Sequence, residues 1–140
     1  MRNGSIKIFK YWGPVVFWAG LIFYLSSLPP SSVTGDYWTE FAIKKTAHVI
    51  EYGVLATLLY RAFRVSVEGL QRQYWLSAIL SSLYGATDEF HQSFIPGREP
   101  RGRDVIFDTI GAVLAIYIIW KLLPKAPKRL KTWAKKLQLI

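Results

Sequence analysis

Four long apolar stretches dominate the chain, and the first of them, residues 11–28, carries no charged side chain. A membrane-spanning helix needs about 20 predominantly apolar residues, and this stretch nearly reaches that length. It ends at Pro29 and Pro30, and no small-residue site of the kind that signal peptidase cleaves follows it. We therefore predict an uncleaved first transmembrane helix.

The other three apolar stretches, residues 41–63, 74–87 and 105–123, contain or adjoin charged residues. They can span a membrane only if those residues face the interior of a helical bundle or lie near one membrane surface. Mean hydropathy is only +0.19, so composition alone would also allow a soluble bundle. The segment pattern favours an all-α polytopic membrane protein with four transmembrane helices, and 16% aromatic residues suit rings at the membrane interfaces.

Basic residues are divided unevenly between the two predicted sides of the membrane. The segments before the first span, between the second and third, and after the fourth hold thirteen of the 18 basic residues but one acid, Glu68. The opposite side holds the other five basic residues and eight acids. The positive-inside rule then places both termini in the cytoplasm. We interpret the formal charge of +9 as a topology signal and expect no nucleic-acid partner.

Residues 124–140 form a basic tail, which we separate from a transmembrane domain of residues 1–123. Leu130, Trp133, Leu137 and Ile140 recur at helical spacing, and lysines occupy positions between them. A basic amphipathic helix of this kind lies on an anionic membrane surface. The alternative is a solvated and frayed tail.

The predicted topology gathers the polar residues of the spans on the extracytoplasmic side. Residues three or four positions apart share one face of a helix, as Lys44, His48 and Glu51 do in the second span. The pattern recurs with Tyr84, Asp88, His91 and Gln92 in the third span and with Asp104, Asp108 and Gly111 in the fourth. We expect the three helices to turn these stripes toward a common centre. Small residues would let the helices approach closely; they are Gly53, Gly85, Gly111, Ala112 and Ala115.

These side chains divide by the chemistry that they can supply. Carboxylates and imidazoles act as general acids or bases, which makes the catalytic candidates His48, Glu51, Asp88, Glu89 and His91. Basic and amide groups bind anions or pair with nearby acids, which makes the ligand-binding candidates Lys44, Lys45, Gln92, Arg98, Arg101, Arg103, Asp104 and Asp108. The chain has no cysteine, no obvious nucleophile and no recognised metal-ligand spacing, so we expect neither a metal nor another cofactor.

The same residues allow other interpretations. Buried ion pairs can simply hold helices together, which would make the protein a structural or accessory subunit without a ligand. A small transporter or flippase would need a polar route to the inner face or an oligomer, and the sequence shows no such route. The sequence leaves open whether any reaction is catalysed and which oligomer forms.

Three runs of residues resemble the motifs of the VanZ-like membrane proteins. Residues 45–53 read KTAHVIEYG, residues 84–98 read YGATDEFHQSFIPGR, and residues 103–111 read RDVIFDTIG. The second run is the most specific of the three. The resemblance covers about residues 10–122, and the basic tail lies outside it. Where this chain has Asp108, the family often has Asn, which implies that an amide is sufficient there.

The resemblance implies a small polytopic protein of the bacterial cytoplasmic membrane with a role in the cell envelope. The family is named for an accessory protein that protects against the glycopeptide teicoplanin, but it supplies no reaction. Combined with the polar constellation, it suggests a pocket open to the extracytoplasmic side. We expect that pocket to bind or process an anionic envelope lipid, a lipid-linked precursor or a phospholipid head group.

Overall fold

A computed structural model describes residues 2–29, 35–98 and 102–140, and within these ranges the chain is helical, with no strand. Five α-helices form: α1 (Arg2–Ser26), α2 (Tyr37–Ser66), α3 (Leu70–Gln92), α4 (Gly102–Tyr117) and α5 (Lys128–Lys136). A π-helical turn, Ile118–Leu122, and a 3-10 turn, Leu123–Lys125, connect α4 to α5. The all-α prediction is confirmed.

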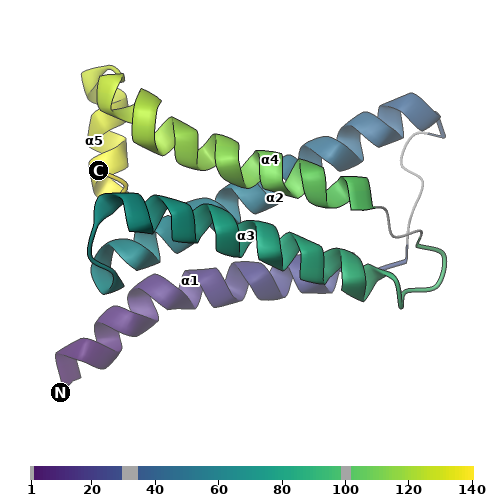
Figure 1. Ribbon diagram of the computed structural model, residues 1–140, viewed down its shortest axis with the longest axis horizontal. Helices are drawn as coiled ribbons and strands as arrows, with labels where there is room; N and C mark the ends of the chain where they lie inside the picture. Colours follow the sequence, from purple (N-terminus) through teal and green to yellow (C-terminus); the bar gives the residue numbers. More distant parts are fainter. Residues whose placement is uncertain (1, 30–34, 99–101) are drawn as a thin grey trace.

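Helices α1 to α4 run alongside one another, and the two ends of the bundle differ (Figure 1). Both chain termini lie at one end, and α5 crosses that end. The segment that follows α3 lies at the other end, where α1 finishes and α2 and α4 begin. Since a helix rises about 1.5 Å per residue, α1, α2 and α3 are each more than 30 Å long, which is about the thickness of a bilayer's hydrocarbon core.

The outer surface of the bundle is apolar. Phe9, Phe17, Trp38 and Trp75 are each more than 60% exposed, and large aliphatic side chains are exposed along all four long helices. A soluble monomer rarely exposes apolar surface on this scale, whereas lipid contact requires it. Tyr37 and Trp38 mark one end of the bundle. Tryptophans on α3, in the π-helical turn after α4 and on α5 mark the other; this is the distribution of interfacial aromatic belts.

Two helical segments, Ile8–Ser26 and Gly102–Lys125, are long and apolar enough to cross a membrane by length and composition. Helices α2 and α3 do not reach that threshold, because hydropathy averages count polar residues wherever they point. In the structure, Asp88 and Gln92 of α3 are buried inside the bundle. The prediction of four spans therefore stays a prediction for α2 and α3.

The core depends on a close crossing of α2 and α4. A Cβ atom on Gly111 would overlap the backbone of Val49, and one on Gly53 would lie 3.3 Å from the Gly111 carbonyl oxygen. Gly85 of α3 likewise leaves room for the Asp108 side chain, since a Cβ there would lie 2.9 Å from its Oδ2. The predicted role of small residues in close helix approach is confirmed.

Helix α2 starts at a well-defined cap beside the polar end of the bundle. Asp36 is its N-cap and accepts hydrogen bonds from the backbone N–H and the hydroxyl of Thr39, at 2.8 and 2.7 Å. These hydrogen bonds, first that of the Thr39 hydroxyl, lower the pKa of the Asp36 carboxyl. The cap fixes where α2 begins and hence the height at which its polar residues lie.

The tail folds as a helix and is not frayed. Leu130, Trp133 and Leu137 remain exposed on α5, while Ala134 is buried against the bundle. Ile140 departs from the predicted apolar stripe, because Gln138 adopts a positive φ of 61° and turns the chain back toward α2. Contact of α5 with a membrane surface stays a prediction.

Candidate functional site

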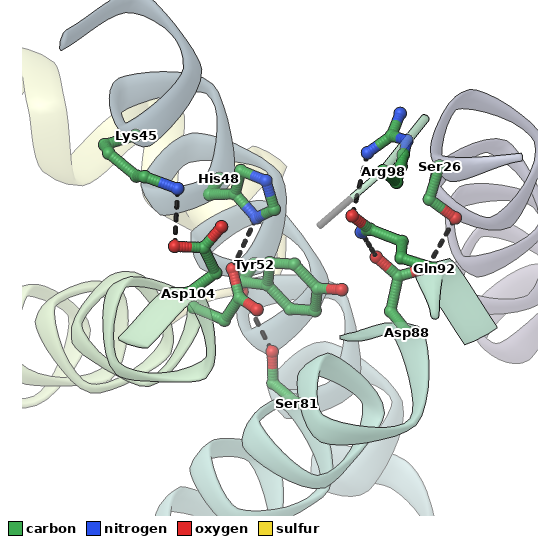
Figure 2. Close-up of polar contacts among 10 residues, drawn as sticks. Ser26, Lys45, His48, Tyr52, Ser81, Asp88, Gln92, Arg98 and Asp104 are labelled. Carbon is green, nitrogen blue, oxygen red and sulfur yellow. Dashed lines mark hydrogen bonds and ion pairs between the residues drawn. The ribbon is translucent and has the colours of Figure 1, made fainter. Parts of the chain in front are cut away.

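A cavity of about 790 Å³ opens at the end of the bundle where α1 finishes and α2 and α4 begin. Apolar side chains, including Ile22, Leu25 and Phe41, form part of its wall. Charged and polar side chains line the rest; they are Ser26, Glu40, Lys44, Lys45, His48, Glu51, Asp88, Gln92, Arg98 and Asp104. Figure 2 shows the polar side chains in two groups that face each other.

The first group connects α2 to α4. Lys45 Nζ lies 2.5 Å from Asp104 Oδ1, and His48 Nδ1 lies 2.8 Å from Asp108 Oδ1. Asp108 is fully buried, so it meets His48 away from water. A carboxylate that accepts the Nδ1 hydrogen fixes the orientation of the imidazole and leaves Nε2 available. No described residue hydrogen-bonds to that second nitrogen.

The second group is a chain of hydrogen bonds that connects α1 to α3 and to the segment after it. Asp88 accepts from the Ser26 hydroxyl at 2.6 Å and from Gln92 Nε2 at 2.8 Å. The Gln92 Oε1 accepts from Arg98 Nη1 at 2.8 Å. Arg98 also donates to the carbonyl oxygens of Leu25 and Leu28 at 3.1 to 3.2 Å. The guanidinium thus adds donors to backbone carbonyls at and just after the end of α1.

Tyr52 lies between the two groups in Figure 2, and Glu51 lines the same cavity. The Tyr52 ring stacks on His48 at a centroid distance of 6.3 Å, and in Figure 2 its hydroxyl is directed toward the Asp88 group. That hydroxyl is buried and has no hydrogen-bond partner in the described part of the chain. Glu51 lines the cavity, and no described residue hydrogen-bonds to or pairs with its carboxylate.

Most of the residues singled out in the sequence come together at this cavity. Those that line it are Lys44, Lys45, His48, Glu51, Asp88, Gln92, Arg98 and Asp104. Lys44 reaches only the rim and pairs with Glu40 at 3.1 Å. Asp108 does not line the cavity but bonds to Nδ1 of His48, which does. Glu89 is buried near His48 and Asp104.

Two of the predicted residues, His91 and Arg103, are directed away from the cavity. His91 points toward α1, where its Nε2 lies 3.0 Å from the Ser27 hydroxyl and its ring is 4.3 Å from that of Phe23. Arg103 is exposed above the Phe41 ring, at 5.6 Å. Arg101 lies outside the described residues. His91 separates from Asp88 because a three-residue step turns about 60° on a helix, and Gln92 is the neighbour that stays with Asp88.

Sequence reasoning missed two participants. Ser26, the last residue of α1, bonds directly to Asp88, although serines at the end of an apolar span gave no signal of their own. Tyr52 adjoins Glu51 within the first motif, and only the packing shows that its ring stacks on His48.

A divalent cation has a set of donors here. His48, Glu89 and Asp104 offer ligand atoms within 4.8 Å of one another. Imidazole and carboxylate groups suit several divalent metals. The Lys45 ammonium, however, already lies against Asp104 and supplies a positive charge at that point.

The fold and the site together define a small helical membrane protein with an apolar exterior and a polar cavity at one end. Within that class, the chain belongs to the VanZ/LLP1 family, whose sequence model matches residues 9–124. The match includes both polar groups of the cavity and ends before α5. Comparisons with curated proteins and with solved structures found no match.

Proposed function

We propose that the protein spans the bacterial cytoplasmic membrane four times and binds the head group of an anionic envelope lipid, or of a lipid-linked precursor, in the cavity. The end with the termini holds the last turns of α2, with Arg61 and Arg64, the first turn of α3, with Arg72, and the basic tail. This distribution favours the cytoplasm for that end. The cavity then opens on the extracytoplasmic side.

One observation supports head-group binding most directly: the cavity combines an apolar wall with a polar, cation-bearing wall. Ile22, Leu25 and Phe41 lie on one part of its surface, and Lys45 and Arg98 on another. An amphiphile needs both, since its chain avoids water while its phosphate seeks positive charge.

Arg98 is the best candidate for the anion contact. Lys44 and Lys45 pair directly with carboxylates, whereas the hydrogen bonds of Arg98 go to two carbonyls and an amide. Its positive charge is not cancelled by a carboxylate within ion-pairing distance in the described part of the chain. A lipid phosphate entering between α1 and α2 would meet that charge near the cavity mouth.

Arg98→Ala is expected to lower the retention of a co-purifying anionic lipid about tenfold, because a charge-assisted contact to phosphate is lost. The measurement is native mass spectrometry of protein taken from its own membrane with lipids retained. Arg103→Ala is the matched control, since it removes the same charge from the same end but outside the cavity. Equal retention in the two variants would refute the proposed role of Arg98.

The His48–Asp108 pair favours a second candidate, an enzyme that hydrolyses such a lipid. Asp108 holds Nδ1 of His48, so Nε2 can take a proton from a water molecule that attacks the lipid's ester or phosphoester. The bond to the leaving alcohol oxygen then breaks, and the protonated His48 returns the proton to that oxygen. Teicoplanin resistance, suggested by the resemblance to VanZ, would follow from either candidate if the lipid belongs to the cell-wall pathway.

His48→Gln is expected to reduce hydrolysis by at least about a hundredfold, the usual contribution of a general base, while keeping a hydrogen-bonding group beside Asp108. His91→Gln removes a histidine that points away from the cavity and is the control. Lipid products formed in reconstituted vesicles, followed by mass spectrometry, measure the difference. Comparable product formation by the two variants would exclude His48 as the base.

A further inference from the structure

The opposite end of the bundle holds a second cavity, of about 250 Å³. Its lining comes from α1, the last turns of α2, and the tail; the residues are Tyr11, Arg61, Arg64, Val65, Lys135, Gln138 and Ile140. Three of these side chains are cationic and none is acidic. This cavity shares no residue with the one described above.

The tail closes this cavity by folding back onto α2. Arg64 Nη1 donates to the Gln138 carbonyl at 2.9 Å, and Arg61 Nε donates to Gln138 Oε1 at 3.4 Å. The Arg61 guanidinium also lies over the Tyr11 ring, 5.4 Å from its centroid. The two arginines are therefore positioned by neutral groups, and part of each guanidinium remains available to another acceptor.

No carboxylate lies within ion-pairing distance of Arg61, Arg64 or Lys135 in the described part of the chain. All three ion pairs found there lie at the other end of the bundle. The only acidic residue between Glu51 and Asp88 is Glu68, which is exposed, and none follows Asp108. Arg61 and Arg64 each keep N–H donors that are available to another acceptor, and Lys135 lies beside them. Arginine and lysine side chains grouped in this way suit the binding of phosphate oxygens.

Apolar groups adjoin this basic cavity. Helix α5 crosses the end of the bundle (Figure 1). Leu130 and Trp133 on it and Leu137 directly after it are 53% to 64% exposed. Trp133 carries Lys136 over its ring, at 5.4 Å. An exposed tryptophan between lysines is typical of a helix that lies at the level of lipid head groups.

We propose that Arg61, Arg64 and Lys135 bind the phosphate of an anionic phospholipid from the leaflet that faces this end, with α5 resting in the same interface. The apolar groups of α5 select a lipid over free phosphate, because they would contact its acyl chains. The family match ends at residue 124, so it covers Arg61 and Arg64 but not the tail residue Lys135. The phospholipid site is independent of the proposed function of the first cavity.

The test is native mass spectrometry of the full-length protein in detergent, titrated with phosphatidylglycerol and, separately, with zwitterionic phosphatidylcholine. Arg61→Gln/Arg64→Gln is expected to weaken phosphatidylglycerol binding about tenfold and to leave phosphatidylcholine binding unchanged, because charge-assisted contacts to phosphate are lost. Lys135→Gln should weaken phosphatidylglycerol binding several-fold. Lys135 is exposed, so this substitution removes no buried contact. Arg72→Gln, an exposed arginine at the same end but outside the cavity, should change it less than about twofold.

Three outcomes would overturn the proposal. Phosphatidylglycerol could bind equally well to all of these variants and the wild type. Inorganic phosphate could displace the lipid, which would make the ligand a free anion. The wild type could form a dimer that the Lys135 variant loses, which would make this face an interface between two copies. Arg98→Ala should retain this lipid, so the two cavities are tested separately.

Discussion

Gly111→Ala is expected to lower the free energy of unfolding by about 3 kcal/mol, at the upper end of the usual cost of overpacking a core. Its Cβ would overlap the carbonyl oxygen, carbonyl carbon and Cα of Val49. These are backbone atoms inside a helix, so they cannot rotate away as a side chain would. Helices α2 and α4 would have to separate, and the contacts Lys45–Asp104 and His48–Asp108 would lengthen with them.

Thermal unfolding of detergent-solubilised protein, followed by circular dichroism, measures this effect. Gly20→Ala is the control, because a Cβ at Gly20 meets no other side chain or helix within 4 Å in the described part of the chain. That change should be neutral or stabilising by up to about 1 kcal/mol, since alanine favours a helix over glycine. An unfolding temperature for Gly111→Ala equal to that of Gly20→Ala would show that the α2–α4 crossing is not as tight as described.

The second large effect is expected for Asp88→Ala, which should lower the free energy of unfolding by about 3 kcal/mol. Buried donors lose their acceptor when the carboxylate is removed. The Ser26 hydroxyl and the Gln92 amide both donate to Asp88. Gln92 in turn orients Arg98, so the change also disturbs the contact between Arg98 and the end of α1. The end of α1 should detach from α3 before the rest of the bundle unfolds.

Hydrogen exchange at the C-terminal turns of α1 detects this local opening, and thermal unfolding measures the total loss. Asp88→Asn keeps one acceptor oxygen and should lose about half as much stability. Thr87→Ala is the neighbouring control, because Thr87 is exposed and bonds only within its own helix. Unchanged exchange in α1 of the Asp88→Ala variant would mean that the Ser26–Asp88 bond does not hold the two helices together.

The gathering of polar residues at one end could be predicted because it depends on chain order alone. A helix that crosses a bundle has its first residues at one end and its last residues at the other. Lys45, Asp104 and Asp88 therefore lie at the same end of the bundle whatever the packing details. The same argument places Arg61 and the basic tail at the opposite end, where the structure has them. It could not predict that Gln138 would turn the tail back onto Arg64.

The sequence by itself therefore determined the helical class, the membrane-compatible exterior and the end at which the polar residues collect, since these follow from hydropathy and spacing along one helix at a time. Only the tertiary structure decided which side chains touch. Asp88 turned to Ser26 and Gln92 while His91 turned to Ser27, although both lie in the same short motif. The physical reason is that a rotation of tens of degrees about a helix axis, set by contacts such as Gly111 against Val49, redirects a side chain without altering any sequence pattern.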